Sequence, residues 1–79
     1  MSSSAIKIEP RAVDVTVTDD TLRVRLADGR EVSVPLAWFP RLARGSVAER
    51  QRWQLIGDGV GIHWPELEED LSVAGLLAT

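Results

Sequence analysis

Residues 53–77 read WQLIGDGVGIHWPELEEDLSVAGLL, and the rest of the chain is organised around this stretch. Two short apolar runs, 54–56 and 60–64, flank a Gly57-Asp58-Gly59 turn, which predicts a β-hairpin. Pro65 should end the second of these strands, because proline cannot donate to a ladder. The acidic run that follows would suit a helix start, and Ser72 is placed to cap a short C-terminal helix.

Apolar and polar residues alternate within residues 13–18, 22–26 and 31–34, in the part of the chain that precedes this stretch. Such alternation is typical of half-buried strands. A two-residue turn at Asp19-Asp20 would place Val13 opposite Leu26 and keep every apolar side chain on one face. The pattern therefore predicts a three-stranded antiparallel meander with one apolar face, its strands at 12–18, 21–27 and 30–35.

The second turn of this meander is defined by its register. A two-residue turn would mix the two faces of the sheet, whereas a three-residue loop that ends at Gly29 sets Val24 opposite Val32. That loop needs a left-handed residue at its last position, followed by a bulge, and glycine adopts this conformation without a Cβ penalty. We therefore expect Gly29 to have a positive φ.

Two short helical pieces should connect the meander to the second hairpin. Apolar residues lie close to helical spacing between Leu36 and Arg44, and Gly45 is a plausible stop. Ser46 and Glu49 form the sequence pattern of a capping box, which predicts a second helix over about 47–53. The segment is thus expected to be helical and kinked at Gly45.

Length and composition favour one small domain. At 79 residues the chain holds a single core, and we expect a flexible segment at 1–9 followed by one α+β domain at 10–79. The chain has no Cys and one His, so a structural disulfide or zinc site is not expected, and no cofactor motif is recognisable. The N-terminus lacks the pattern of a signal peptide and no apolar run is long enough for a membrane helix, which favours the cytoplasm.

Charge is distributed unevenly around a net value of −3. Residues 38–54 carry four Arg against one Glu, a sum of +3, and residues 55–79 carry five acids with no Lys or Arg, a sum of −5. The overall acidity disfavours general nucleic-acid binding, which depends on cations that neutralise phosphates. The opposite signs of the two regions are also compatible with self-association, and a homodimer is expected for a small domain with exposed strand edges.

These segments resemble the bacterial domain-of-unknown-function family 2442. The resemblance rests on DDTLRVRLADGREVSVPL, PLAWFPRL and AERQRWQLIGDGVGIHWPELEEDLSVAGLL, and it covers residues 12–77. It implies a small α+β domain with no established activity and no catalytic residues to carry over. Members look like short proteins that are often encoded beside another small protein, in what resemble toxin–antitoxin pairs. The resemblance also implies that some longer relatives carry a helix-turn-helix domain after this one, which is not expected in this chain.

Aromatic and cationic residues form the main candidate binding patch. Trp and Arg are enriched among the dominant residues of protein interfaces, and the same combination suits single-stranded nucleic acid. The alternative is that Trp38 and Trp53 face the core while the Arg side chains are solvated, and we expect both Trp side chains to be mostly buried. The candidate residues are Trp38, Arg41, Arg44, Arg50, Arg52, Trp53, His63 and Trp64.

Three further motifs have structural explanations that outweigh the chemical ones. His63 beside Trp64 could act as an acid or base, but it could equally be a histidine at the end of a strand. The acids at 66–70 do not fit the spacing of a calcium loop, and the glycines at 57–61 lead into a strand rather than a helix, unlike a phosphate loop. The sequence therefore favours a non-catalytic module that binds another protein, plausibly the antitoxin-like member of a small pair. A nucleic-acid-associated regulator with an Arg/Trp surface and a small enzyme that uses His63 are the alternatives.

Overall fold

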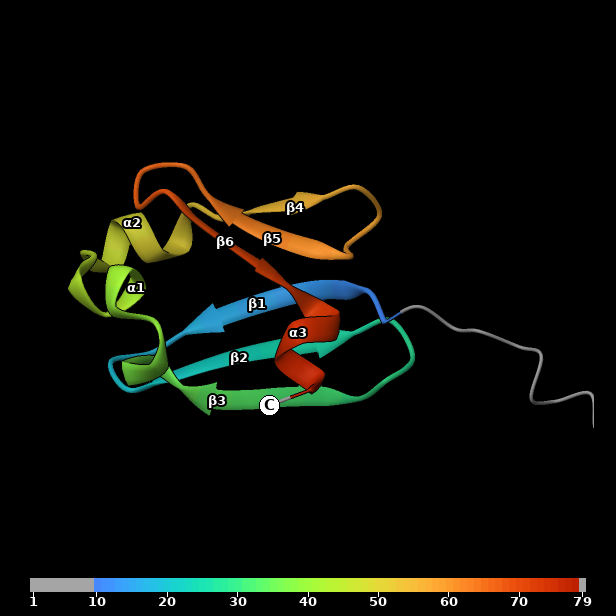
Figure 1. Ribbon diagram of the computed structural model, residues 1–79. Coiled ribbons are helices and arrows are strands. Elements are labelled where there is room, and N and C mark those ends of the chain that lie inside the picture. Colours follow the sequence, from blue (N-terminus) through green and yellow to red (C-terminus); the bar gives the residue numbers. More distant parts are fainter. Residues whose placement is uncertain (1–9, 79) are drawn as a thin grey trace, which may run out of the picture.

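The computed structural model describes residues 10–78, which form two three-stranded antiparallel sheets and a few short helices (Figure 1). The strand orders are β1-β2-β3 and β4-β5-β6. The α+β class with an N-terminal meander is confirmed, and the expected flexible segment 1–9 lies outside the described residues. The strands of the first sheet are β1 (Ala12–Val17), β2 (Thr21–Leu26) and β3 (Glu31–Pro35).

The first hairpin has the predicted two-residue turn. Val17 pairs with Leu22, and Val15 pairs with Val24. The Thr18 amide donates to the Thr21 carbonyl at 2.9 Å, and the Thr18 hydroxyl accepts from the Thr21 amide at 3.1 Å. The turn residues thus satisfy their own backbone, and this fixes the register that the alternation requires.

The prediction that Val13 faces inward is wrong. A bulge between Ala12 and Asp14 shifts the register, so Ala12 pairs with Leu26 and is 1% exposed, while Val13 is 49% exposed. The physical cause lies in the turn at residues 57–60, because the Ala12 amide donates to the Gly59 carbonyl at 2.7 Å. The extra residue in β1 reverses which side chains face the core before the bulge.

The second hairpin confirms the three-residue loop. Leu26 donates to the Arg30 carbonyl at 2.8 Å, and Gly29 has a φ of +96°. Val24 pairs with Val32, as the predicted register requires. Asp28 closes the loop by accepting from the Arg30 amide at 3.0 Å and from its guanidinium at 2.7 Å.

The helical connection also follows the prediction, although its pieces are shorter. Ser46 and Glu49 make both bonds of the capping box, at 3.1 and 2.8 Å, and Gly45 ends the preceding helix. In Figure 1 these helices lie at one end of the two sheets. In the described part of the chain, no helix has both the length and the apolar character needed to cross a membrane. The connection consists of a 3₁₀ turn η2 (Leu36–Trp38), α1 (Pro40–Arg44) and α2 (Val47–Gln51).

The second sheet contains a strand that the sequence pattern did not predict. The hairpin β4 (Gln54–Ile56) and β5 (Gly61–Trp64) was expected, but the chain then turns back and β6 (Glu69–Ser72) pairs with β5. The acidic run is therefore a turn and a strand, not the start of a helix. The C-terminal helix α3 (Val73–Leu77) follows directly, and the Ser72 hydroxyl caps it as expected by accepting from the Gly75 amide at 2.9 Å.

The acidic turn forms because the helical end of the molecule holds it. Leu67 packs so close to Gly45 that a Cβ there would lie 2.7 Å from a Leu67 methyl group. Glu68 has a φ of +52°, the one non-glycine residue with positive φ among those described, and its carbonyl accepts from Arg41 at 2.6 Å. These tertiary contacts compensate for a left-handed residue that local propensity would avoid.

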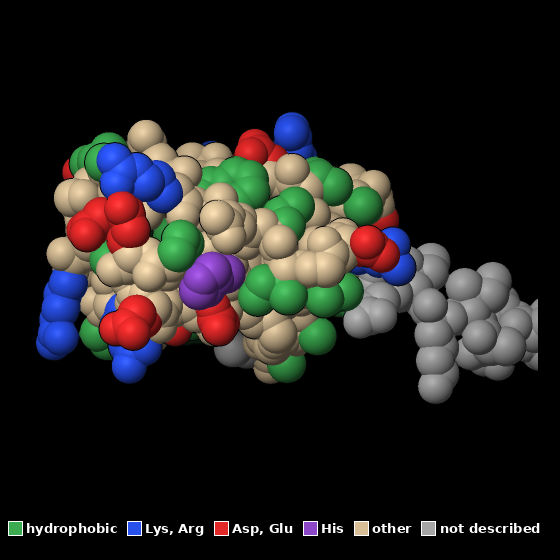
Figure 2. Space-filling view, turned by 90° about the horizontal axis from the view of Figure 1, so that it is seen from above, with side chains coloured by type: hydrophobic (Ala, Val, Ile, Leu, Met, Phe, Trp, Pro, Cys, Tyr) green, Lys and Arg blue, Asp and Glu red, His purple; other side chains and the backbone are tan. Residues whose placement is uncertain are grey.

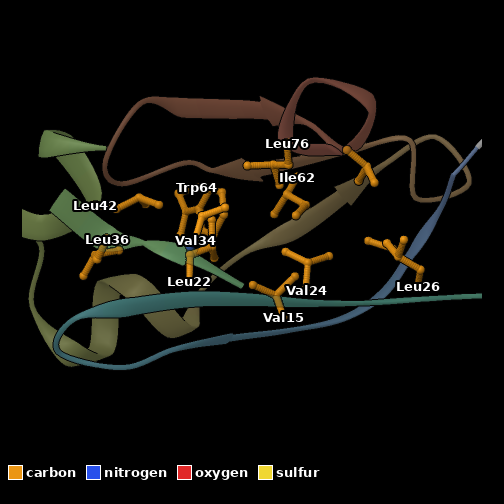
Figure 3. Packing of buried hydrophobic residues seen from close by; sticks show 12 residues of the cluster. Val15, Leu22, Val24, Leu26, Val34, Leu36, Leu42, Ile62, Trp64 and Leu76 are labelled. Carbon is orange, nitrogen blue, oxygen red and sulfur yellow. The ribbon is translucent and has the colours of Figure 1, made fainter. Parts of the chain in front are cut away.

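The core lies between the two sheets. Figure 3 shows Val15 and Val24 on one side of the core, facing Ile62 and Leu76 on the other. Ile62 and Val24 are both completely buried. Apolar area removed from water in this layer is the main source of stability for a domain without disulfides.

The three Trp residues differ in their burial. Trp64 fills the core at 0% exposure, whereas Trp38 is 54% exposed and Trp53 is half-buried. The prediction that Trp38 would be mostly buried is therefore wrong. The 3₁₀ turn that carries Trp38 buries Leu36 instead, and Trp64 from β5 occupies the volume that the valine face needed to fill.

Candidate binding face on the second sheet

The second sheet has an inner and an outer face that are set by its register. Cross-strand partners share a face, and successive residues of a strand alternate between faces. Ile62 and Trp64 point into the core, so Gly61 and His63 lie on the outer face. Their cross-strand partners lie on the same face, and these are Gln54, Ile56, Asp70 and Ser72.

A shallow groove of about 480 Å³ runs across this outer face. Gly61 forms its floor, since it has no side chain between Ile56 on β4 and Ser72 on β6. A Cβ at Gly61 would lie 3.2 Å from Ile56 Cδ1 and 3.3 Å from the Leu71 carbonyl oxygen. Glycine therefore allows both neighbouring strands to approach closely while leaving the groove open. The residues that line it are Ile56, Val60, Gly61, Asp70, Leu71 and Ser72.

His63 lies next to this groove, and its Nδ1 atom is hydrogen-bonded to the Asp70 carboxylate. An ionised carboxylate only accepts, so the ring must carry its proton on Nδ1 and leaves Nε2 as the atom that can meet a ligand. The side chains of His63 and Asp70 are 36% and 66% exposed. Figure 2 views this face and shows the histidine at the surface with an acidic side chain beside it.

The structure thus places a second polar group, Asp70, beside His63, but the site is not a deep pocket. An oriented His–Asp pair can accept a proton or fix a hydrogen bond to a partner. The adjacent groove is open to solvent along the sheet. Among residues 10–78 no cluster of three or more metal-binding side chains is present.

The predicted Arg/Trp patch is dispersed by contacts within the chain. Arg50 is 11% exposed at its side chain and donates to the Leu42 and Ala43 carbonyls at 2.9 and 2.7 Å. Arg41 donates to the Glu68 carbonyl. Both guanidinium groups therefore stabilise the backbone through hydrogen bonds, and they do not form a shared cationic surface.

Arg52 pairs with Glu66 at 2.7 Å, and hydrogen bonding to this carboxylate raises the pKa of the Arg52 guanidinium. Arg44 and Trp38 are exposed, while Trp53 packs partly against the core. The Trp64 side chain is inaccessible, and its indole N–H donates to the Arg50 carbonyl at 3.0 Å. Of the eight candidate residues, only His63 belongs to the outer face of the second sheet.

The outer face of the first sheet is polar and internally neutralised. Arg23 pairs with Glu31 at 3.0 Å, and Arg25 lies 3.8 Å from Asp14. A smaller hollow of about 200 Å³ lies among these charged residues and Thr16. The two sheets therefore present different surfaces, one with paired charges and one with an apolar groove.

One carboxylate, Asp70, lines the groove. Glu68 lies in the turn before β6, and Glu69 pairs with the inward-facing Trp64; within the described residues neither forms an ion pair with an Arg. In contrast, Asp58 and Glu66 are paired with Arg11 and Arg52. Glu68 and Glu69, which have no Arg partner among the described side chains, thus lie outside the groove lining.

Sequence reasoning identified His63 but missed Ile56, Gly61, Asp70 and Ser72 as parts of one site. They meet only because β6 pairs with β5, and the acidic run concealed that strand. A signal was present in Leu71 and Val73, which alternate with Asp70 and Ser72. Read as a strand, this alternation would have placed Asp70 opposite His63.

Comparison with known proteins agrees with this architecture. Residues 12–79 match the family model described as "Protein of unknown function (DUF2442)". The fold is similar to a crystal structure of a protein of unknown function from Rhodospirillum rubrum ATCC 11170, with 30% sequence identity and a TM-score of 0.75. That match covers 90% of this chain and 88% of the other. No curated protein matches.

The chain is therefore a small α+β domain built from two antiparallel three-stranded sheets, with a groove on the outer face of the second sheet. It belongs to the family DUF2442, whose description states that its function is unknown.

Proposed function

We propose that this domain is a non-catalytic protein-interaction module that binds its partner with the outer face of the second sheet. The observation that carries the proposal is the 480 Å³ groove on this face, whose apolar side chains come from Ile56 and Val60. Ile56, which lies on this face opposite Gly61, is 42% exposed. Apolar side chains held open on a small domain are typical of surfaces that bind another protein.

The geometry around His63 favours binding over catalysis. A general base acts on a substrate that is enclosed and held in position, and closure of the site excludes water. The groove beside His63 is shallow and open, so the His63–Asp70 pair is better suited to a directional hydrogen bond at the edge of an interface. The small enzyme that uses His63 remains the alternative, and a reaction abolished by His63→Gln would replace the binding proposal.

The Arg/Trp surface supports the nucleic-acid alternative less well. Phosphate binding needs several cations directed at one surface. Arg41 and Arg50 donate to backbone carbonyls, and Arg52 is paired with Glu66. We therefore place the partner on the second sheet and propose a protein as its chemical class.

The finer proposal is an antitoxin-like role, in which the partner is a small protein encoded beside this one. It rests on the small size of the domain and on the family resemblance. In such a pair the module would neutralise its partner by covering a surface, and for this it needs no catalytic group of its own.

The test is capture of the partner from the native host by three tagged proteins. Ile56→Arg places a bulky charge in the groove, and Val47→Arg is the control because Val47 is 62% exposed on α2, far from the groove lining. We expect the wild type and the Val47 variant to retain the same protein and the Ile56 variant to lose it. Retention by the folded Ile56 variant would move the binding surface elsewhere.

A further inference from the structure

The groove on the second sheet lies beside the point at which the chain enters the fold. The Ala12 amide donates to the Gly59 carbonyl, in the turn between β4 and β5, at 2.7 Å. Arg11 lies 3.5 Å from Asp58 in the same turn. Val60, at the end of that turn, lines the groove, and Figure 1 shows the start of β1 at the same end of the molecule as this turn. The segment that precedes the described residues therefore joins the fold next to the groove.

Residues 5–9 read AIKIE, and their apolar pattern suits the groove. We propose that this segment folds back over the β4–β5 turn and docks on the second sheet of its own chain, with the side chains of Ile6 and Ile8 in the groove. Ile6 and Ile8 are two residues apart, so an extended segment places both on one face. Pro10 follows Glu9, and a proline disfavours helical backbone at the residue before it, which favours the extended form.

The groove is suited to an apolar occupant without net charge. Its apolar side chains come from Ile56 and Val60, and Gly61 leaves its floor open. Asp70 is the one carboxylate in the lining and is already hydrogen-bonded to His63, so it does not require a cationic occupant. The charges of the segment, one Lys and one Glu, sum to zero. Removal of apolar side chains from water is therefore the main contribution to docking.

The segment is long enough to reach across the face of the sheet. Extended residues span roughly 3.3 Å each, so the segment 5–9 covers about 16 Å. Neighbouring strands are about 4.8 Å apart, so crossing from β4 to β6 takes about 10 Å. A segment tethered this closely meets the groove at an effective concentration of about millimolar, which favours it over a separate molecule with the same side chains. The inference goes beyond the proposed function, because it concerns the free protein, and a partner at the groove would have to displace the segment.

The test is a paramagnetic label on the whole chain. The chain has no Cys, so Ser3→Cys carries a single nitroxide that weakens the NMR amide signals of nearby residues. Gly61 reports on the groove. Gly29 is its matched control, because the loop that carries it is also joined to the start of β1, where the Ala27 amide donates to the Arg11 carbonyl at 2.8 Å. An undocked segment would reach both glycines alike, whereas we expect the Gly61 signal to lose most of its intensity and the Gly29 signal to lose little.

Variants test the contact itself. In the labelled protein, Ile6→Ser with Ile8→Ser keeps the length of the tether and should restore the Gly61 signal. Ile56→Ser should have the same effect from the other side of the contact, whereas Val47→Ser on α2, outside the groove lining, should not. Amide spectra without the nitroxide verify that each variant is folded.

Equal weakening of the Gly29 and Gly61 signals, or weakening of Gly61 that survives both serine substitutions in the segment, would overturn the docking of the isoleucines. A mixture of nitroxide-labelled protein with isotope-enriched protein that lacks the nitroxide distinguishes the segment of the same chain from that of a second copy. Weakening of Gly61 in the enriched protein would assign the segment to a second copy and overturn docking within one chain. The assay contains no partner, so these results overturn the inference alone, and capture of the native partner that depends on Ile56 tests the proposed function separately.

Discussion

Two glycines with nearly the same backbone conformation test how the two sheets are joined. Gly29 has a φ of +96° and Gly59 has a φ of +104°, so alanine at either position pays the same penalty for a left-handed backbone. Their surroundings differ completely. A Cβ at Gly29 would meet nothing within 4 Å, whereas a Cβ at Gly59 would lie 2.3 Å from the Ala12 carbonyl oxygen.

The conformational penalty for alanine should be about 1–2 kcal/mol at each position. At Gly59 the clash with backbone adds about 1–3 kcal/mol, as for other overpacked sites. Moving β1 away also weakens the 2.7 Å bond from the Ala12 amide to the Gly59 carbonyl, which removes about 1 kcal/mol more. We therefore expect Gly59→Ala to destabilise the domain by about 2–4 kcal/mol more than Gly29→Ala.

The assay is urea unfolding followed by tryptophan fluorescence, with the thermal midpoint as a second measure. For a domain of this size each kcal/mol lowers the midpoint by about 4–8 °C, so the two variants should be clearly resolved. Gly29→Ala should remain folded at room temperature, since whole domains are stable by about 5–15 kcal/mol. Equal destabilisation by the two changes would refute the close contact between Gly59 and Ala12, and with it the junction between the sheets.

Three further predictions concern the core, a surface loop and assembly. Trp64→Phe should destabilise the domain by about 2 kcal/mol in urea unfolding, because it leaves a cavity and removes the donor to the Arg50 carbonyl. Trp38→Phe should be nearly neutral, and equal effects of the two changes would contradict the placement of Trp64 in the core. Hydrogen bonds from Arg30 lower the pKa of Asp28, so the contribution of Asp28 to stability is present above the unfolded-state pKa near 3.8 and is lost as pH falls through the lower folded-state pKa. A carboxyl titration by NMR with a midpoint at or above that of unfolded aspartate would refute this prediction. Self-association as a homodimer, predicted for a small domain with exposed strand edges, is checked by sedimentation at micromolar concentration, where a single species near 8.7 kDa would exclude it.

The meander was predictable because local chemistry and tertiary packing agree there. Alternation places the valines on one face, and the Asp19-Asp20 turn and the Gly29 loop each permit only one register that keeps them there. The capping box at Ser46 was equally predictable from the sequence, since both of its hydrogen bonds are made within four residues. The error at Val13 arose where this agreement ends, because a contact with Gly59, distant in the sequence, creates the bulge.

The candidate site was less predictable, because its decisive strand is held by contacts from another part of the chain. Four acids within residues 66–70 have poor strand propensity, and helix-start chemistry explains them well in isolation. Arg41 on α1 nevertheless binds the Glu68 carbonyl, and Leu67 packs on Gly45, so the chain is turned back onto β5. Once β6 is paired, Asp70 must lie opposite His63, and Ser72 must lie opposite Gly61. Arg41, predicted as part of the Arg/Trp patch, thus stabilises the turn that brings β6 beside β5, and this pairing forms the groove.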